Sequence, residues 1–257
     1  MPDPREFFIC RKLDNTHQEI HNDWEHTLNH ITIGEFLTHF DQYLEKNYNP
    51  LDFDKQFWEE MDELSINYQH PRELYFPSDS NIQKGDFGEA LCSYVVSHLF
   101  NIDIPVLPWA RKITRDKPIS NFDLIGYKIV DNEINTFYIF TSKCSPKLKN
   151  LRSLISDTSN EFRELTKWQL ISKLRLFYRL FQSEIDESLF IDFLSRFLQD
   201  NNRNQIKILG FFTCSNKAYL ENCGTRFNDL NNLFSGNRHI IRINYIRAII
   251  RYFFRRN

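Results

Sequence analysis

The segment between residues 119 and 143 constrains the fold of this chain more than any other. Two apolar runs, 119–130 and 136–143, are rich in aromatic and β-branched residues and lie on either side of Asp131-Asn132-Glu133. Short polar stretches of this kind favour a turn, and apolar runs on both sides of a turn predict a β-hairpin. The chain is therefore expected to contain a sheet.

Helices are expected on both sides of this hairpin. Residues 86–100 carry apolar side chains at steps of three and four, which predicts a buried helix. The remaining expectations are helices over 14–30, 35–48, 53–64, much of 147–183 and 190–198, a connector over 65–84, an extended or irregular piece over 104–114, a short central strand over 207–214, and an apolar, arginine-rich end over 238–256.

Composition places the chain among ordinary globular proteins. Its 257 residues are 41% hydrophobic, which is enough for a substantial core. There is no stretch of 18 apolar residues, and the first residues do not form a signal peptide, so neither membrane insertion nor export is expected. Five scattered cysteines without a CxxC pair indicate reduced thiols and a cytoplasmic protein.

Charge divides the chain at about residue 80. Residues 1–80 hold 17 acidic and 6 basic side chains, a net charge of −11, whereas residues 81–257 carry +9. Such asymmetry predicts an acidic helical N-terminal region, 1–80, followed by a basic core, 81–257, that suits an anionic partner. The acidic region either faces a basic partner or is simply solvated.

Three residues carry the candidate chemistry. Glu89 comes early in a helix after Gly85-x-x-Gly88, Asp123 interrupts an otherwise apolar strand, and Lys143 ends the next strand. Acidic groups that converge on a lysine can hold a divalent cation and activate a water beside a phosphodiester. Each residue also has an ordinary explanation, as a helix-end charge, a hydrated strand end or a lysine that protects a sheet edge.

The order helix, strand, strand, strand, helices, strand between residues 85 and 214, with these residues in place, resembles the PD-(D/E)XK nuclease superfamily. The resemblance implies an α+β fold with a restriction-endonuclease-like core, a mixed four- to five-stranded sheet flanked by helices after a helical N-terminal extension. It also implies hydrolysis of DNA dependent on Mg²⁺ or Mn²⁺. The Gly-x-x-Gly-Glu start and the helical extension are similar to the nuclease subunit of the Hachiman anti-phage defence system. That similarity implies a defence endonuclease with a helicase-like partner, bound through the acidic region.

The resemblance also implies roles for single residues. Asp123 would be the shared metal ligand, and Glu89 would bind the metal or hold a metal-bound water. The backbone carbonyl of Ser142 would be a further ligand. Lys143 would lower the pKa of the attacking water or stabilise charge on the phosphorane.

Thr141 departs from the pattern, because the superfamily has an acid two residues before the lysine. The acid can have migrated to the following helix, where Asp157 lies 14 residues after Lys143 and is followed by Glu161 and Glu164. Alternatively, Glu89 and Asp123 suffice as ligands. In the third interpretation the fold is degenerate and only binds nucleic acid or a partner.

Basic residues follow the candidate site and recur at the end of the chain. Arg247, Arg251 and Arg255 are spaced at four, so a helix would align them as a stripe suited to phosphates or as a solubilising face. The candidate nucleic-acid contacts are Lys147, Lys149, Arg152, Arg247, Arg251 and Arg255.

Two histidine pairs have helical metal-ligand spacing. His17 and His21, and likewise His26 and His30, are four residues apart in the helix expected over 14–30. A partner surface or a solvated helix explains them as well as a metal does.

Overall fold

The computed structural model describes residues 4–12, 24–48, 76–110, 112–114, 117–118, 124–145, 153, 156, 166–181, 185–199, 205–215 and 237–254. Its strands are β1 (Phe8–Lys12), β2 (Trp24–Leu28), β3 (Lys112–Thr114), β4 (Lys117–Pro118), β5 (Leu124–Val130), β6 (Glu133–Ser145), β7 (Ile206–Ser215) and β8 (Asn237–Ile243). The helices are the short η1 (Pro4–Glu6), α1 (Ile33–Tyr48), α4 (Ser80–Phe100), α6 (Lys167–Phe181), α7 (Glu187–Gln199) and α10 (Ile246–Phe254).

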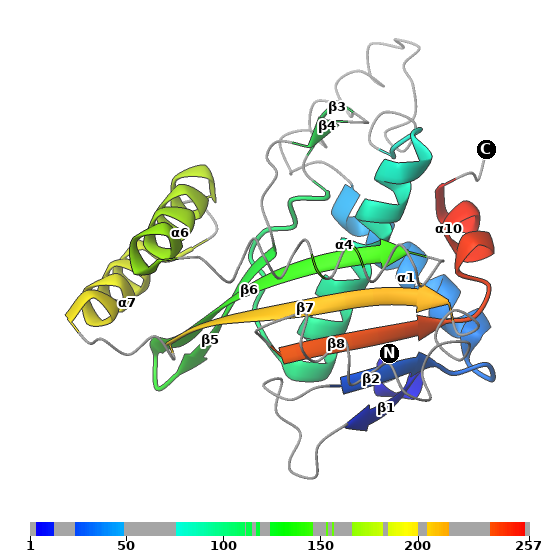
Figure 1. Ribbon diagram of the computed structural model, residues 1–257, viewed down its shortest axis with the longest axis horizontal. Coiled ribbons are helices and arrows are strands. Elements are labelled where there is room, and N and C mark those ends of the chain that lie inside the picture. The colour runs from blue at the N-terminus through cyan, green and yellow to red at the C-terminus, as the bar shows by residue number, and fades with distance from the viewer. Residues whose placement is uncertain are drawn as a thin grey trace, which may run out of the picture.

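Six of the described strands form one mixed sheet in the order β1-β2-β8-β7-β6-β5 (Figure 1). The four inner strands β2, β8, β7 and β6 are parallel, whereas β1 and β5 are antiparallel to their neighbours. The carboxyl ends of the four parallel strands therefore meet at one edge of the sheet, where ligand sites commonly lie in α/β folds.

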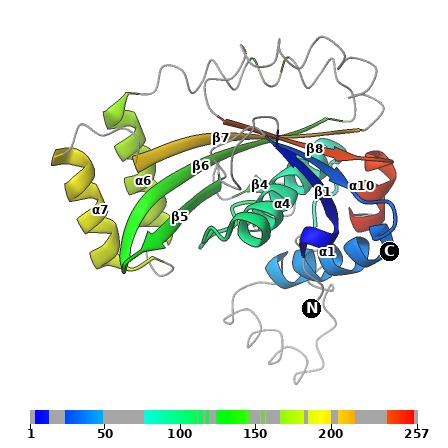
Figure 2. The same ribbon diagram turned by 90° about the horizontal axis from the view of Figure 1, so that it is seen from below.

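The two faces of the sheet bury separate sets of side chains. Helices α1, α4 and α10 pack on one face, and α6 and α7 pack on the other, near β5 and β6 (Figure 2). On α1, Phe36, Phe40 and Leu44 repeat every four residues and are fully buried. The ring of Phe40 meets Phe87 of α4 and Phe253 of α10, which joins the three helices in one core.

The hairpin predicted from the apolar runs is confirmed. Strands β5 and β6 pair antiparallel from Val130↔Glu133 to Leu124↔Phe140. The turn is made by Asp131 and Asn132, which both have positive φ, a conformation that Asp and Asn adopt more readily than most residues. The predicted helices at 35–48, 86–100 and 190–198 and the central strand at 207–214 are also present, each a few residues longer.

The helix expected over 14–30 is wrong where the structure describes it. Residues Trp24–Leu28 form β2, which lies between β1 and β8. A spacing of four between Trp24 and Leu28 fits a helix face, but it also fits one face of a strand, because four is a multiple of two. Residues 14–23 and the helix expected over 53–64 lie outside the described residues.

The sheet has six strands rather than the expected four to five. Strands β1 and β2 come from the N-terminal region, which was expected to be helical, and β8 comes from the start of the segment 238–256. The arginines in β8 obscured its strand character, yet Arg238 is only 5% exposed and Arg242 forms an ion pair with Glu25 of β2.

One boundary also differs from expectation. Helix α4 begins at Ser80, inside the expected connector, because the carboxylate of Asp79 accepts hydrogen bonds from the backbone amides of Asn81 and Ile82. The piece expected over 104–114 to be extended or irregular is irregular over 104–110, and among the described residues an isolated bridge joins Asp103 to Tyr127. The domain boundary near residue 80 stays a prediction, but described segments on both sides of it share one sheet and one core.

Candidate functional site at the end of β6

Helix α4 approaches the carboxyl end of β6 very closely at Gly88. A Cβ atom at this position would lie 2.9 Å from Cβ of Cys144 and 3.2 Å from Oγ of Ser142. Only a residue without a side chain permits this approach. Gly88 therefore permits the close packing of α4 on the strand end, whereas a Cβ at Gly85 would meet nothing within 4 Å.

Glu89 follows this contact directly and is half-buried. Its carboxylate lies near Cys92, whose thiol pKa is raised first by burial and second by the charge of Glu89. A partly desolvated carboxylate close to a strand end is a suitable ligand for a hard cation.

Ser142 has a buried hydroxyl that finds no hydrogen-bond partner within the described part of the chain. Buried hydroxyls are normally paired, so an orphan of this kind is informative about a site. The ladder between β5 and β6 stops at the pair Leu124↔Phe140, while β6 continues to Ser145. On that side the last part of β6 has no strand neighbour among the described residues.

Alternation along β6 places the candidate residues on two faces. Phe140 and Cys144 pack with the core beneath α4, whereas Phe137 and Ile139 pack with α6 and α7. By the same alternation Thr141, which is 2% exposed, and half-buried Lys143 face the α6–α7 side. Glu89, on α4, and Lys143, on β6, thus lie on opposite sides of the sheet.

Several predicted site residues lie outside the described residues. Asp123 immediately precedes Leu124, which is the first residue of β5 and pairs with Phe140 of β6. The others are Asp157, Glu161, Glu164, Lys147, Lys149, Arg152 and Arg255. Within the described ranges no three His, Cys, Asp or Glu side chains are grouped closely enough to hold a metal.

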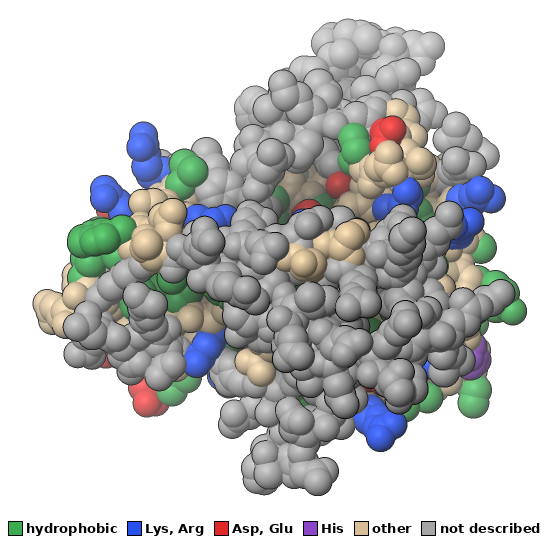
Figure 3. All heavy atoms as spheres, viewed as in Figure 1, with side chains coloured by type: hydrophobic (Ala, Val, Ile, Leu, Met, Phe, Trp, Pro, Cys, Tyr) green, Lys and Arg blue, Asp and Glu red, His purple; other side chains and the backbone are tan. Residues whose placement is uncertain are grey.

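Helix α10 carries the described part of the predicted arginine stripe. Arg247 and Arg251 are exposed, while Ile246, Ile250 and Phe253 are buried against the core. A second basic surface lies on α6, where Arg175 and Arg179 are exposed. Trp168 and Leu176 of the same helix are also exposed. Figure 3 shows Lys and Arg side chains together with hydrophobic ones at the α6–α7 end.

One cluster, at the opposite end of α4, was not predicted from the sequence. His26 lies on β2 rather than on a helix with His30, and its buried ring contacts Cys10 of β1 and His239 of β8. The spacing of two between Trp24, His26 and Leu28 is the feature of the sequence that would have indicated a strand with these three side chains on one face. His17 and His21 lie outside the described residues.

These features define a mixed α/β protein with a polar site at the end of an inner strand. The sequence model of the HamA family matches residues 4–254, and the chain belongs to this family. Membership makes the protein a component of the Hachiman anti-phage defence system, in which a partner is implied. A search of curated proteins finds no match. Among the helices that the structure describes, none is long and apolar enough to cross a membrane.

Proposed function

We propose that this protein is the nuclease of its defence system and hydrolyses DNA with Mg²⁺ or Mn²⁺ at the carboxyl end of β6. The observation that supports this most is the approach of α4 to β6 at Gly88. Glu89 is the next residue of α4 after this contact, and Lys143 lies between the two contacted residues of β6, Ser142 and Cys144.

The residues at this end fit a hard divalent cation. Glu89 and Asp123 would supply carboxylate oxygens, and the Ser142 carbonyl and unpaired hydroxyl are further oxygen donors. Asp123 is bonded to Leu124, the first residue of β5, which pairs with Phe140 of β6. A cation bound here would lower the pKa of a bound water and offset charge on the phosphate.

Lys143 has a separate task in this scheme. Its ammonium group, at the end of β6, would orient the attacking water and offset the negative charge that develops on the phosphorus oxygens. Half-burial of Lys143 favours this task, because a partly desolvated ammonium interacts more strongly with an anion than an exposed one does.

One of the carboxylates that follow β6 in the sequence would replace the acid missing at Thr141. Thr141 and Lys143 face the side of the sheet covered by α6, and the segment with Asp157, Glu161 and Glu164 leads from β6 into α6. A carboxylate from that segment would approach the metal from the face of Lys143, while Glu89 approaches from the other.

The alternative function is binding without cleavage. It is favoured by the threonine at position 141 and by the placement of Glu89 and Lys143 on opposite faces of the sheet. In this case the basic helices would hold DNA without cleaving it. A helicase-like partner, docked on the acidic N-terminal region, would supply the enzymatic activity.

Calorimetry with Mg²⁺ and Mn²⁺ separates the two functions. A nuclease should bind the metal, Asp123→Asn should abolish binding, and Asp157→Asn should weaken it if the acid has migrated. If metal binding is instead lost on substitution of Glu161 or Glu164, that residue is the ligand in place of Asp157. DNA binding that persists in a protein with no metal binding and no cleavage, alone or with its partner, would establish the alternative.

A further inference from the structure

Strand β1 forms one edge of the sheet, and its register with β2 shows which of its backbone groups point outward. The amide of Asn29 donates to the carbonyl of Phe7 at 2.8 Å. These two residues lie just outside the register pair Phe8↔Leu28, so that pair is non-hydrogen-bonded. The two kinds of pair alternate along an antiparallel ladder. Cys10, two residues after Phe8, is therefore in a non-hydrogen-bonded pair as well, and its amide and carbonyl point away from β2.

This edge of the sheet is open among the described residues, whereas the other edge is partly covered. On β5, Tyr127 exchanges two backbone hydrogen bonds with Asp103, of 2.9 and 3.1 Å. No described strand pairs with β1 on its outer side, where Ile9 is 61% exposed and Cys10 and Arg11 are also exposed. A strand edge with outward amides and carbonyls is a template for a further strand.

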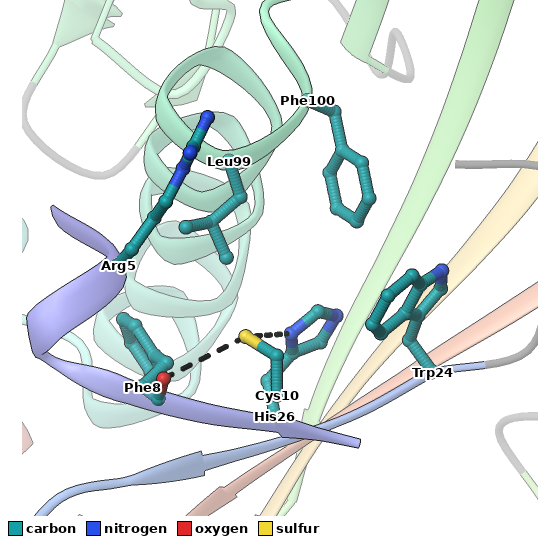
Figure 4. Close-up of a pocket in the computed structure, with 7 residues that line it drawn as sticks. All are labelled: Arg5, Phe8, Cys10, Trp24, His26, Leu99 and Phe100. Atoms are coloured by element: carbon teal, nitrogen blue, oxygen red, sulfur yellow. Dashed lines mark hydrogen bonds between the residues drawn. The ribbon is translucent and has the colours of Figure 1, made fainter. Parts of the chain in front are cut away.

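A pocket of about 140 Å³ lies beside this edge, on the face of the sheet that α4 covers (Figure 4). It is bounded by Cys10 and His26 of the two outermost strands and by Leu99 and Phe100 at the end of α4. An apolar protein cavity of about 150 Å³ holds one benzene ring. The pocket can therefore take one aromatic or branched aliphatic side chain.

The ring nitrogens and the thiol in the floor of the pocket are already paired within the protein. Nδ1 of His26 lies 3.2 Å from Sγ of Cys10, and Nε2 of His26 lies 3.2 Å from Nδ1 of His239. The other lining residues are Phe8, Trp24, Leu99, Phe100 and Arg5. An apolar guest would leave none of these floor atoms without a hydrogen bond, which favours it over a polar guest.

An antiparallel second copy of this chain does not supply such a guest. In an antiparallel β1–β1 pair, the residue opposite Cys10 would itself be one whose backbone points outward, and its side chain would lie on the same face. The candidates are Phe8, Cys10 and Lys12. Phe8 is only 4% exposed in its own core, Cys10 is small, and Lys12 carries a charge. The guest therefore comes from a different chain.

We propose that the partner implied by family membership adds an extended segment antiparallel to β1 and places an apolar side chain, opposite Cys10, in the pocket. Strand addition takes its affinity from backbone hydrogen bonds and its specificity from pockets for alternate side chains. The residues on either side of the inserted one would lie on the other face, beside Ile9 and Arg11, where an apolar and an acidic side chain fit. The proposal rests on the existence of the partner and not on the proposed cleavage.

Calorimetry with the purified partner and the full chain tests this docking. Cys10→Pro removes the outward amide, and an edge strand tolerates proline where its N–H would face solvent. The partner should bind this variant at least about tenfold more weakly than the wild type. Cys10→Ser is the matched control, because it keeps the amide and a hydroxyl for His26, and it should bind like the wild type.

The pocket and the charge beside it are tested separately. Leu99→Trp fills the pocket and should weaken binding, whereas Leu198→Trp, at a position on α7 that is 44% exposed, should not. Leu99→Trp also serves if Cys10→Pro does not fold. Arg11→Glu should weaken binding by repelling the acidic residue, while Lys128→Glu, exposed on the opposite edge strand β5, should not. Equal binding by Arg11→Glu and Lys128→Glu would overturn the acidic residue.

Hydrogen exchange provides a readout at single amides. In the free protein the amides of Ile9 and Arg11, which face β2, should exchange slowly and that of Cys10 quickly; in the complex the Cys10 amide should become protected. No binding of the partner to the wild type, unchanged binding in Cys10→Pro and Leu99→Trp, or a Cys10 amide that stays unprotected would overturn the docking. So would a wild-type dimer in light scattering that Cys10→Pro makes monomeric, because a second copy would then occupy the edge. None of these results bears on the proposed cleavage.

Discussion

At the scale of residues, Gly88 decides how closely α4 approaches β6. Gly88→Ala would put a methyl group 2.9 Å from Cys144 and 3.2 Å from Ser142, so the helix has to move away from the strand. The expected cost is about 1–3 kcal/mol in the free energy of unfolding, measured by denaturant titration. Gly85→Ala, three residues earlier with open space around it, should be neutral or stabilise by up to about 1 kcal/mol. Equal effects at both glycines would contradict the close approach.

His26 makes stability depend on pH. Its ring is fully buried, and burial first and His239 second lower its pKa well below the ordinary value of 6.5. Below pH 6.5 the unfolded chain therefore binds a proton that the folded chain excludes, and stability falls as the pH decreases from 6.5 towards the lowered pKa.

The slope attributable to this one group is at most about 1.4 kcal/mol per pH unit. Denaturation midpoints between pH 7.5 and 5 measure it. His26→Phe should flatten the curve in this window, whereas His30→Gln, at an exposed position, should leave it unchanged. A wild-type curve that is flat below pH 6.5 would show that the buried ring does not resist protonation.

At the scale of elements, α10 joins the fold to the proposed binding of phosphates. Its apolar face is buried, and Arg247 and Arg251 project from the other face. Changing both to Ala should reduce the slope of log K against log salt for duplex DNA by about 1.8, since each phosphate contact contributes about 0.9. Arg196→Ala is the control, because that arginine already pairs with Glu133 and Asp192. An unchanged slope would place the phosphate contacts on another element.

Elements with a strong local signal could be predicted from the sequence. A turn or apolar periodicity within their own residues predicts the β5–β6 hairpin, α4, α7 and β7. Strands β2 and β8 could not be predicted in this way. Their strand character rests on pairing between segments more than 200 residues apart, and Glu25 and Arg242 are charged residues buried only because they pair with each other.

The same limit applies to the candidate site. The resemblance to the PD-(D/E)XK superfamily implied that Glu89 and Lys143 converge at one edge of the sheet, and this stays a prediction. Strand alternation also implied that Thr141 and Lys143 share a face. Which face α4 covers depends on packing of the whole core, so the opposite placement of Glu89 and Lys143 required the structure.

At the scale of the whole molecule, the acidic N-terminal region is part of the folded body. Strand β2 pairs with β8, and Phe36, Phe40 and Leu44 of α1 are completely buried among residues of α4 and α10. A chain of residues 81–257 would lose two strands and expose the apolar face of its core. It should therefore lack a cooperative thermal transition and bind a hydrophobic dye, whereas the full chain should unfold cooperatively. A cooperative transition in 81–257 would show that the basic part is a domain of its own.

Cleavage of DNA is the measurement that decides whether the end of β6 is a catalytic site. Full-length protein, with its partner where one is required, should cut DNA in Mg²⁺ or Mn²⁺ and not in a chelator. Asp123→Asn, Glu89→Gln and Lys143→Ala should each lower the rate by at least about a hundredfold. Lys128→Ala, an exposed lysine on β5, should cut at the wild-type rate. Metal-dependent cleavage that survives Asp123→Asn and Lys143→Ala would contradict a catalytic site at the end of β6.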